Sequence, residues 1–306
     1  MTDLHTHTTY SDSSASVSDL LKEAQALKLT HLSISDHDVI GAYSELENKQ
    51  TRALFSGKII PAVELTSLFE GDAIEVLAYG IDLDIMGRLV KKNVKPFIDS
   101  IEDQSYLYMA TFKKLGVKFD SDFVELISKT PEKIFADRRT YSQGVYLEQM
   151  RKYPENAKFF KSSDEFMNIS VKDFTRNYIY NTKSPLYTDL SPLVISAARA
   201  VEFAHEAGGL AFLAHPFVYS PDFTKKIEYV LDRYDFDGVE CFYPTFTKEQ
   251  SEYLCSLCDK RSLYKSGGSD FHGLDIKPDN HLGYGTEQQP IELEHLLPWI
   301  DKVKTI

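Results

Sequence analysis

Short apolar runs that end in histidine or carboxylate side chains recur along this chain, and segments with helical spacing separate many of them. "THLSISDHD" contains His37, "GKIIPAVELTS" contains Glu64, "LAFLAHP" contains His215, and "SLYKSGGSDFHG" contains Asp270 and His272. Strands that alternate with helices form α/β folds, and in an α/β barrel the C-terminal strand ends meet at one face. Packing alone does not explain these positions, because Asp and Glu are rarely buried without a partner. The pattern therefore predicts an α/β barrel whose strand ends bring these side chains together.

The opening segment "DLHTHTTYSD" places His5 and His7 two residues apart, and Asp12 follows a few residues later. In an extended strand, residues i and i+2 point to the same side. Residues 3–7 are therefore predicted to be a first strand that delivers two imidazoles to one point. The alternative is a polar, disordered chain end, because termini fray unless something holds them.

Two further apolar runs carry an acidic residue: "AIEVLAYGID" contains Glu75 and "DGVECFYP" contains Glu240. Helix signals flank the strands, with Ser18 and Ser191 as the predicted N-caps of helices over 18–28 and 191–209. The segment "EQSEYLCSLCDK" is predicted to be a helix. Its cysteine pair, Cys255 and Cys258, is interpreted as core, because no two further zinc ligands pair with it by spacing.

Residues 86–185 break the strand–helix pattern. They are rich in Lys, Tyr and Phe, and stretches such as "SYLYMATFKKLG" and "DFVELISK" have the spacing of amphipathic helices. This segment is predicted to be a helical insertion that covers the mouth of the barrel. The alternative is a separate helical domain with a partner of its own.

The composition restricts the possible partners. The chain has 306 residues, a formal net charge of −12 and three cysteines. An acidic surface disfavours binding to long nucleic acid, whereas a small phosphorylated substrate is compatible if metal ions supply local positive charge. No apolar run approaches the roughly 20 residues of a membrane span, and the polar start is unlike a signal peptide. These features predict a cytoplasmic protein and leave its oligomeric state open.

Histidine and carboxylate together are ligands that suit Zn, Mn or Fe. The candidates outnumber the roughly three or four protein ligands of a single catalytic metal, so they favour a site with about two or three divalent ions. Such a site can hold a hydroxide at neutral pH and clamp a phosphoryl group. The candidate ligands are His5, His7, Asp12, His37, Glu64, His215, Asp270 and His272.

Four motifs in order, "DLHTHTTYSD", "SDHD", "LAHP" and "GSDFH", resemble those of the PHP (polymerase and histidinol phosphatase) family, which is related to the amidohydrolases. The resemblance covers residues 1–84 and about 186–290. It implies a distorted (β/α)7 barrel over 1–85 and 186–306, with an inserted helical subdomain over 86–185. It also implies that His5, His7, Glu64 and Asp270 bind a first metal, Glu64 and His215 a second, and Asp12, His37 and His272 a third.

The chain most resembles family phosphoesterases that carry an Arg-Pro-His and a Gly-Lys in their insertion. "RRTYSQGVYLEQM" matches the first with Arg139 but has Tyr141 in place of the histidine, and "YIYNTKSPLY" matches the second with Lys183. The resemblance implies that Arg139, Lys183 and Tyr141 contact substrate, and an arginine fork suits paired phosphate oxygens. The alternative for the charged pair is a solvated surface position.

Glu75 is a second departure, because the family usually has a histidine there that binds the second metal. Either Glu75 ligates in its place, or it turns away from the site and the second metal is weak or absent.

Together these observations predict a metal-dependent phosphomonoesterase acting on a small phosphate ester. The first candidate substrate is a nucleotide such as AMP or a nucleoside 3′,5′-bisphosphate. A metal-held hydroxide would attack phosphorus, Asp270 would take its proton, and His215 or a metal-bound water would assist the leaving alkoxide. The alternatives are a histidinol phosphatase, a 5′–3′ exonuclease on short oligonucleotides, and a non-catalytic barrel that senses phosphate or metal.

Overall fold

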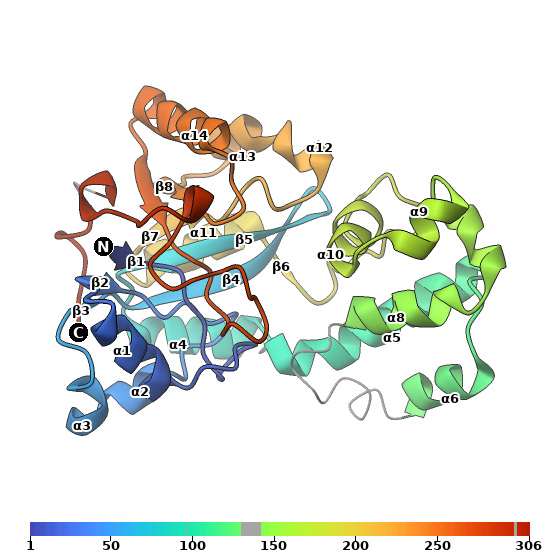
Figure 1. Cartoon of the computed structure of the whole chain (residues 1–306), viewed down its shortest axis with the longest axis horizontal. Coiled ribbons are helices and arrows are strands. Elements are labelled where there is room, and N and C mark those ends of the chain that lie inside the picture. The colour runs from blue at the N-terminus through green and yellow to red at the C-terminus, as the bar shows by residue number, and fades with distance from the viewer. Residues whose placement is uncertain (96, 130–141, 297–298) are drawn as a thin grey trace.

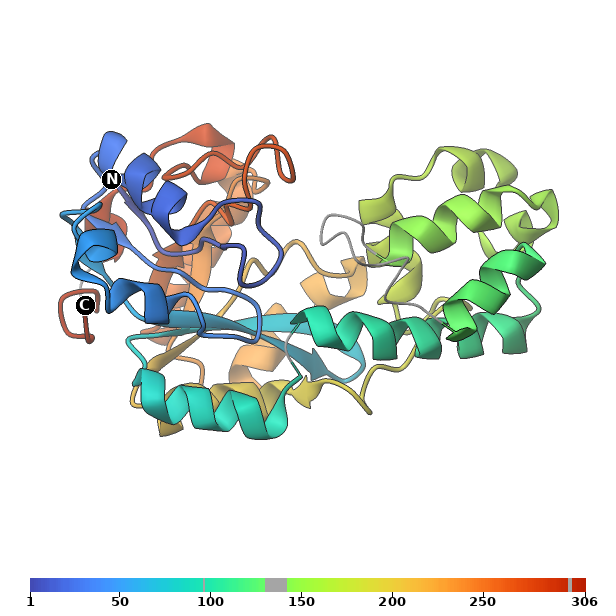
Figure 2. The same ribbon diagram turned by 90° about the horizontal axis from the view of Figure 1, so that it is seen from below.

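The computed structural model describes residues 1–95, 97–129, 142–296 and 299–306. Its strands lie together at one end of the long axis, and the helices of the middle third of the chain lie at the other (Figure 1). Figure 2 shows the same two parts from below, with the long helix α5 leading from one to the other. The strand-containing part is formed by the beginning and the end of the sequence.

The strands form two sheets. The smaller sheet is parallel and has the order β1 (Thr2–Asp3), β2 (His31–Leu32) and β3 (Lys58–Ile59). The larger sheet has the order β6 (Ile195–Ser196), β4 (Ala62–Phe69), β5 (Asp72–Tyr79), β7 (Leu210–Leu213), β8 (Gly238–Phe242) and β9 (Tyr264–Gly267).

The sheets meet at both edges through backbone contacts beyond the named strands. On one side, Leu4 N–H donates to Gly267 O (3.2 Å) and Asp270 N–H donates to His5 O (2.8 Å). On the other side, a parallel bridge joins His37 to Glu64. These two seams carry candidate ligands from distant parts of the sequence, so the α/β fold brings them to one place. The prediction of an α/β fold is confirmed.

Strand β5 runs antiparallel to both of its neighbours, β4 and β7. It follows β4 through the tight turn Glu70–Gly71, where both residues have positive φ (49° and 88°), as hairpin turns matching the strand twist require. The runs that carry Glu64 and Glu75 therefore form a hairpin and not two strands joined by a helix. Consequently Glu75 reaches the site from within β5, and not from a C-terminal strand end as the strand–helix pattern suggested.

Helices cover the outer faces of the strands (Figure 1). Two of these helices have different N-cap residues from those predicted. Ser16, not Ser18, caps the first helix by accepting from Asp19 N–H. Ser196, not Ser191, caps α11, because residues 195–196 pair with β4 and are extended. The helices are α1 (Val17–Ala26), α2 (Tyr43–Leu46), α3 (Lys49–Arg52), α4 (Leu83–Asn93), α11 (Ala197–Glu206), α12 (Pro221–Thr224), α13 (Ile227–Arg233) and α14 (Lys248–Arg261).

The middle third of the chain folds around an apolar cluster of its own, which includes Tyr108, Phe112, Tyr146 and Phe174. That this segment covers the barrel mouth, and that it begins and ends at 86 and 185, stay predictions. Its helical elements are α5 (Phe97–Leu115), α6 (Ser121–Lys129), α8 (Ser142–Arg151), α9 (Ser163–Asn168), α10 (Val171–Phe174), the short 3₁₀ helix Pro154–Phe159 and the π-helical turn Thr175–Ile179.

The cysteines lie where α14 packs on β8. Cys258 and Cys241 are buried with their Sγ atoms 3.7 Å apart, and Cys255 packs at the edge of the same core. Within the described residues, no group able to hold a metal includes a cysteine. Cys258 is therefore a core residue, as interpreted, whereas Cys255 is only partly buried against that core. No described helix is both long and apolar enough to cross a bilayer.

Candidate metal centre

Four side chains from three segments converge at the seam between β1 and β9. Nε2 of His5 lies 3.1 Å from Nε2 of His7 and 3.1 Å from Oε2 of Glu64. Oδ1 of Asp270 lies 3.2 Å from Nε2 of His7 and 3.6 Å from Nε2 of His5. Two imidazole nitrogens and two carboxylate oxygens thus face a common point, which is the donor set of a divalent transition metal.

A second group adjoins the first and shares His7. Nε2 of His272 lies 3.0 Å from Oδ1 of Asp12, and Nε2 of His37 lies 3.8 Å from Oδ2 of the same carboxylate. Nδ1 of His7 is 3.9 Å from Oδ1 of Asp12. All four side chains are buried, so the opening segment is a structural part of the fold and not a disordered end.

Glu75 turns toward the cluster. Its Oε2 lies 3.3 Å from Nε2 of His215, and its Oε1 lies 3.8 Å from Nδ1 of His37. Nε2 of His215 is also 3.1 Å from Oε1 of Glu64. Because Glu75 is the most exposed of the nine candidates, with 24% of its side chain accessible, it stands at the rim of the site.

The contacts of His272 test whether a cation suits the site. Burial lowers the pKa of His272 to about 4, so its ring is neutral near pH 7. Its Nδ1 is 2.9 Å from the carbonyl oxygen of Asp270 and therefore carries the proton. The lone pair of Nε2 then faces the Asp12 carboxylate at 3.0 Å, which is unfavourable unless a cation lies between them. The residues thus fit a metal ion at this position.

The ionisation of the first group supports the same conclusion. Burial lowers the pKa of His7, but the carboxylates of Asp270 and Glu64 outweigh it and raise that pKa to about 9. The same kind of competition raises the pKa of His5 well above its usual range, through Glu64 and Glu240. Protons on these rings balance the carboxylates in the protein without metal, and a bound metal ion would take their place.

Sequence reasoning did not include Glu240 among the candidate ligands. This fully buried residue on β8 accepts from Nδ1 of His5 (Oε1, 3.0 Å) and from the backbone N–H of His215 (Oε2, 2.9 Å). A carboxylate that holds the far nitrogen of a metal-binding histidine fixes its tautomer and orientation. The acidic residue in "DGVECFYP" was visible, but its contacts with two other strands were not.

Asp270 has two further partners that were not predicted. Its Oδ2 accepts from Tyr243 OH (2.7 Å) and from Nζ of Lys277 (2.6 Å). Asp270 also has a positive φ of 52°, a conformation uncommon outside glycine and often found at functional sites. Burial raises the pKa of Asp270, but Lys277 and the neighbouring histidines hold it well below its usual range. The carboxylate therefore stays ionised.

Of the three predicted substrate-binding residues, Lys183 alone lies in the described part of the chain. Arg139 and Tyr141 lie outside the described residues. Nζ of Lys183 is 2.7 Å from Oδ2 of Asp222, its side chain is 73% exposed, and no described contact joins it to the metal-ligand cluster. That these three residues bind substrate stays a prediction.

The insertion nevertheless touches the edge of the site. Nε of Arg176, in the π-helical turn, donates to the carbonyl oxygen of Tyr219. The ring of Tyr219 lies beside that of His215, with centroids 5.3 Å apart, and Glu75 N–H donates to its hydroxyl (2.7 Å). Tyr219 thus links the insertion to the side of the site formed by His215 and Glu75.

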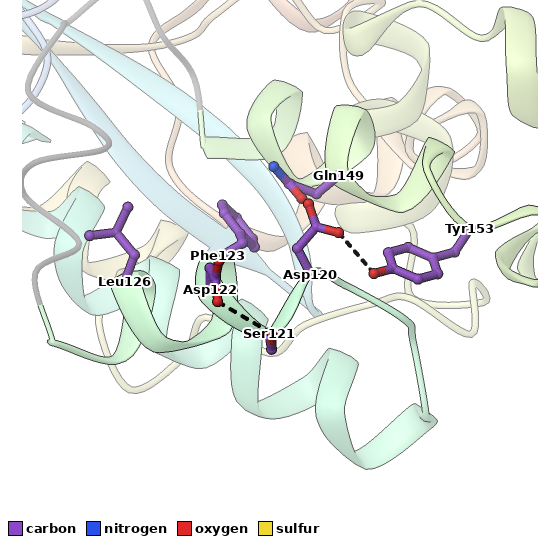
Figure 3. A pocket seen from close by; sticks show the side chains of 7 residues that line it. All are labelled: Asp120, Ser121, Asp122, Phe123, Leu126, Gln149 and Tyr153. Atoms are coloured by element: carbon purple, nitrogen blue, oxygen red, sulfur yellow. Dashed lines mark hydrogen bonds between the residues drawn. The ribbon is translucent and has the colours of Figure 1, made fainter.

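A separate hollow of about 430 Å³ lies within the insertion, where α6 faces α8 (Figure 3). It has no histidine, and its Asp120 carboxylate already accepts from Tyr153 OH (2.8 Å) and pairs with Lys152. It offers no comparable set of metal ligands. The residues that line it are Asp120, Ser121, Asp122, Phe123, Leu126, Gln149 and Tyr153.

An α/β fold that gathers histidines and carboxylates in this way is typical of metal-dependent hydrolases. The PHP domain family model matches residues 3–178, more than half of the chain, and the chain belongs to this family. It is therefore a PHP-domain metal-dependent phosphoesterase, as the four motifs implied. The described clusters of histidine and carboxylate can hold the metal ions that such enzymes require.

Curated relatives and solved structures resemble the chain over most of its length. The 5′-3′ exoribonuclease Rnm of Escherichia coli is 23% identical, over 88% of this chain and 84% of its own. A 5′-3′ exoribonuclease of Haemophilus influenzae is 25% identical, over 88% and 89%. An amidohydrolase structure from Chromobacterium violaceum, with bound sulfate and no metal, has a TM-score of 0.64 at 19% identity and covers 98% and 94% of the two chains.

Proposed function

We propose that this chain hydrolyses phosphoesters at the 5′ end of short RNA, using divalent metal ions held by the described cluster. The observation that carries the hydrolytic chemistry is the convergence of His5, His7, Glu64 and Asp270 on one point. The relatives named as 5′-3′ exoribonucleases match nearly all of this chain, which favours RNA ends over the nucleotide monoester predicted from the sequence. The net charge of −12 favours short substrates over long ones.

Each group of residues has a distinct role in this proposal. Divalent ions bound there would neutralise charge on the phosphoryl oxygens and activate water. One ion would be held by His5, His7, Glu64 and Asp270, and the groups around Asp12 and around His215 are positioned to hold others. Asp270, ionised and fixed by two hydrogen bonds, accepts the proton of the attacking water.

A nucleotide phosphomonoesterase is the second candidate. It needs the same ligands, and it is favoured by the burial of the candidate ligands, of which only Glu75 has more than a tenth of its side chain exposed. A mononucleotide phosphate demands less access than the scissile bond of an oligomer. The two candidates differ in the bond that is cleaved and not in the metal chemistry.

The test uses the full chain with Mn²⁺ and measures its metal content. Its substrates are 5′-phosphorylated oligoribonucleotides of about 5 nucleotides labelled at the 3′ end, AMP, a nucleoside 3′,5′-bisphosphate and histidinol phosphate. Stepwise shortening from the 5′ end, abolished by chelator and by Asp270→Asn, is expected. Release of inorganic phosphate from nucleotides with intact oligomers would support the second candidate. A metal-loaded protein inert toward every substrate would contradict both.

A further inference from the structure

Lys277 is a cation set directly against a predicted metal ligand. Its Nζ lies 2.6 Å from Oδ2 of Asp270, the oxygen that faces away from His7. In a chain with a net charge of −12, this contact places a basic side chain beside a cluster of carboxylates.

The loop that carries Lys277 is held at both ends. Lys277 N–H donates to Gly273 O (2.9 Å), and the side chain of Ser14 donates to Asp275. On the other side, Nδ2 of Asn280 donates to Ser269 O (2.7 Å). Because the loop is tied to the segments that carry Asp12 and Asp270, the ammonium is held in place before any ligand arrives.

The ammonium has donors to spare. A lysine side chain offers three N–H groups, and the contacts among the described residues use one of them, to Asp270. About 31% of the side chain is accessible, so a ligand can reach it. Its pairing with an inward-facing carboxylate distinguishes it from an ordinary surface lysine such as Lys248, whose side chain is 70% exposed.

We propose that Lys277 binds the substrate directly, by donating from its ammonium to a non-bridging oxygen of the phosphoryl group at the metal centre. This rests on the proposed phosphoesterase function and adds a binding residue to it. The ligand class is a phosphate monoester or diester, which carries one or two negative charges. Charge-assisted donors beside a metal site are the appropriate partners for such a group. Lys277 would then play the part that the sequence suggested for Lys183, whose ammonium faces Asp222.

The test measures the binding of inorganic phosphate to the Mn²⁺-loaded protein by calorimetry, with the metal content of each variant determined beforehand. Lys277→Met, which keeps most of the side-chain length without the charge, should weaken phosphate binding by about tenfold or more. Lys277→Arg should recover most of the affinity, because it retains a charged donor. Lys248→Met is the matched control and should bind phosphate like the unmodified protein.

Phosphate affinity within about twofold of the unmodified protein in Lys277→Met would overturn the proposal. So would a loss of metal in Lys277→Met that fully accounts for its weaker binding, because Lys277 would then only position Asp270. If Lys277→Met does not fold, Lys277→Gln repeats the measurement without the charge. Since inorganic phosphate is the probe, a protein that turns over none of the esters but binds phosphate through Lys277 refutes the proposed function alone.

Discussion

Replacing Glu240 with glutamine keeps the shape of a buried side chain at the metal centre but removes one of its two acceptors. The two oxygens of Glu240 have different tasks, since Oε1 accepts from Nδ1 of His5 (3.0 Å) and Oε2 accepts from the backbone N–H of His215 (2.9 Å). A glutamine offers one oxygen and one NH₂ group. Whichever way the amide turns, its NH₂ group faces a donor.

The structure allows two responses: the first destabilises the fold, and the second opposes metal binding directly. If the NH₂ group faces His215 N–H, a buried donor loses its acceptor, at a cost of about 1–3 kcal/mol in the free energy of unfolding. If it faces His5, the ring is driven to the tautomer with its proton on Nε2. That proton points toward His7 and Glu64, where a metal ion would bind. We expect metal affinity to fall by about 10- to 100-fold, as is typical for carboxylates that support metal-binding histidines.

Chelator-competition titration with Mn²⁺ or Zn²⁺ measures this affinity, and circular dichroism confirms that the variant is folded. Glu252→Gln is the control, because Glu252 lies on the exposed side of α14, with 65% of its side chain accessible, and makes the same chemical change. Metal affinity of Glu240→Gln within about threefold of the unmodified protein would refute the reasoning, since Glu240 would then not determine the state of His5.

Three further predictions concern the same centre. Glu75 brings a carboxylate to within 3.3 Å of His215 where the family usually has a histidine, so we expect fewer than three tightly bound transition metals per chain. Glu75→His should raise that number and the retention of zinc on dialysis. Identical values in the two proteins would show that Glu75 is not a ligand. Asp270→Asn should lower kcat by about a hundredfold or more at saturating Mn²⁺, and unchanged turnover would exclude it as the base. Because the pKa of His7 is raised to about 9, the metal-free protein keeps that proton at neutral pH, and a metal ion must displace it. Apparent metal affinity should therefore rise between about pH 6.5 and 9, with proton release that calorimetry in different buffers can measure. A metal affinity independent of pH would contradict this.

Local sequence patterns were sufficient to find most of the candidate ligands. His5 and His7 could be paired because alternation along an extended chain is a local property that needs no knowledge of the fold. His37, His215 and Asp270 could be found because each follows an apolar run, and strand ends in α/β folds share one face. The structure brings all of these residues together, and it shows that Glu75, whose orientation the sequence left open, points to the same cluster.

The tertiary structure decided what depends on contacts between segments far apart in the chain. Ser191 and Ser18 have the residue type of a cap, but pairing of residues 195–196 with β4 moved the start of α11 to Ser196, and Ser16 took the place of Ser18. Nothing near Glu240 in the sequence indicates that it holds a histidine 235 residues away.

Lys277 and Lys183 show that sequence patterns alone did not predict which lysine lies at the metal centre. The sequence suggested a phosphate contact for Lys183, whose ammonium pairs with Asp222 in the structure, and passed over Lys277, whose ammonium lies against Asp270. Charge type and spacing identify groups that can bind metal or phosphate. Which carboxylate each lysine meets depends on how distant loops are tied together, and hydrogen bonds such as those of Ser14 and Asn280 are set only when the whole chain folds.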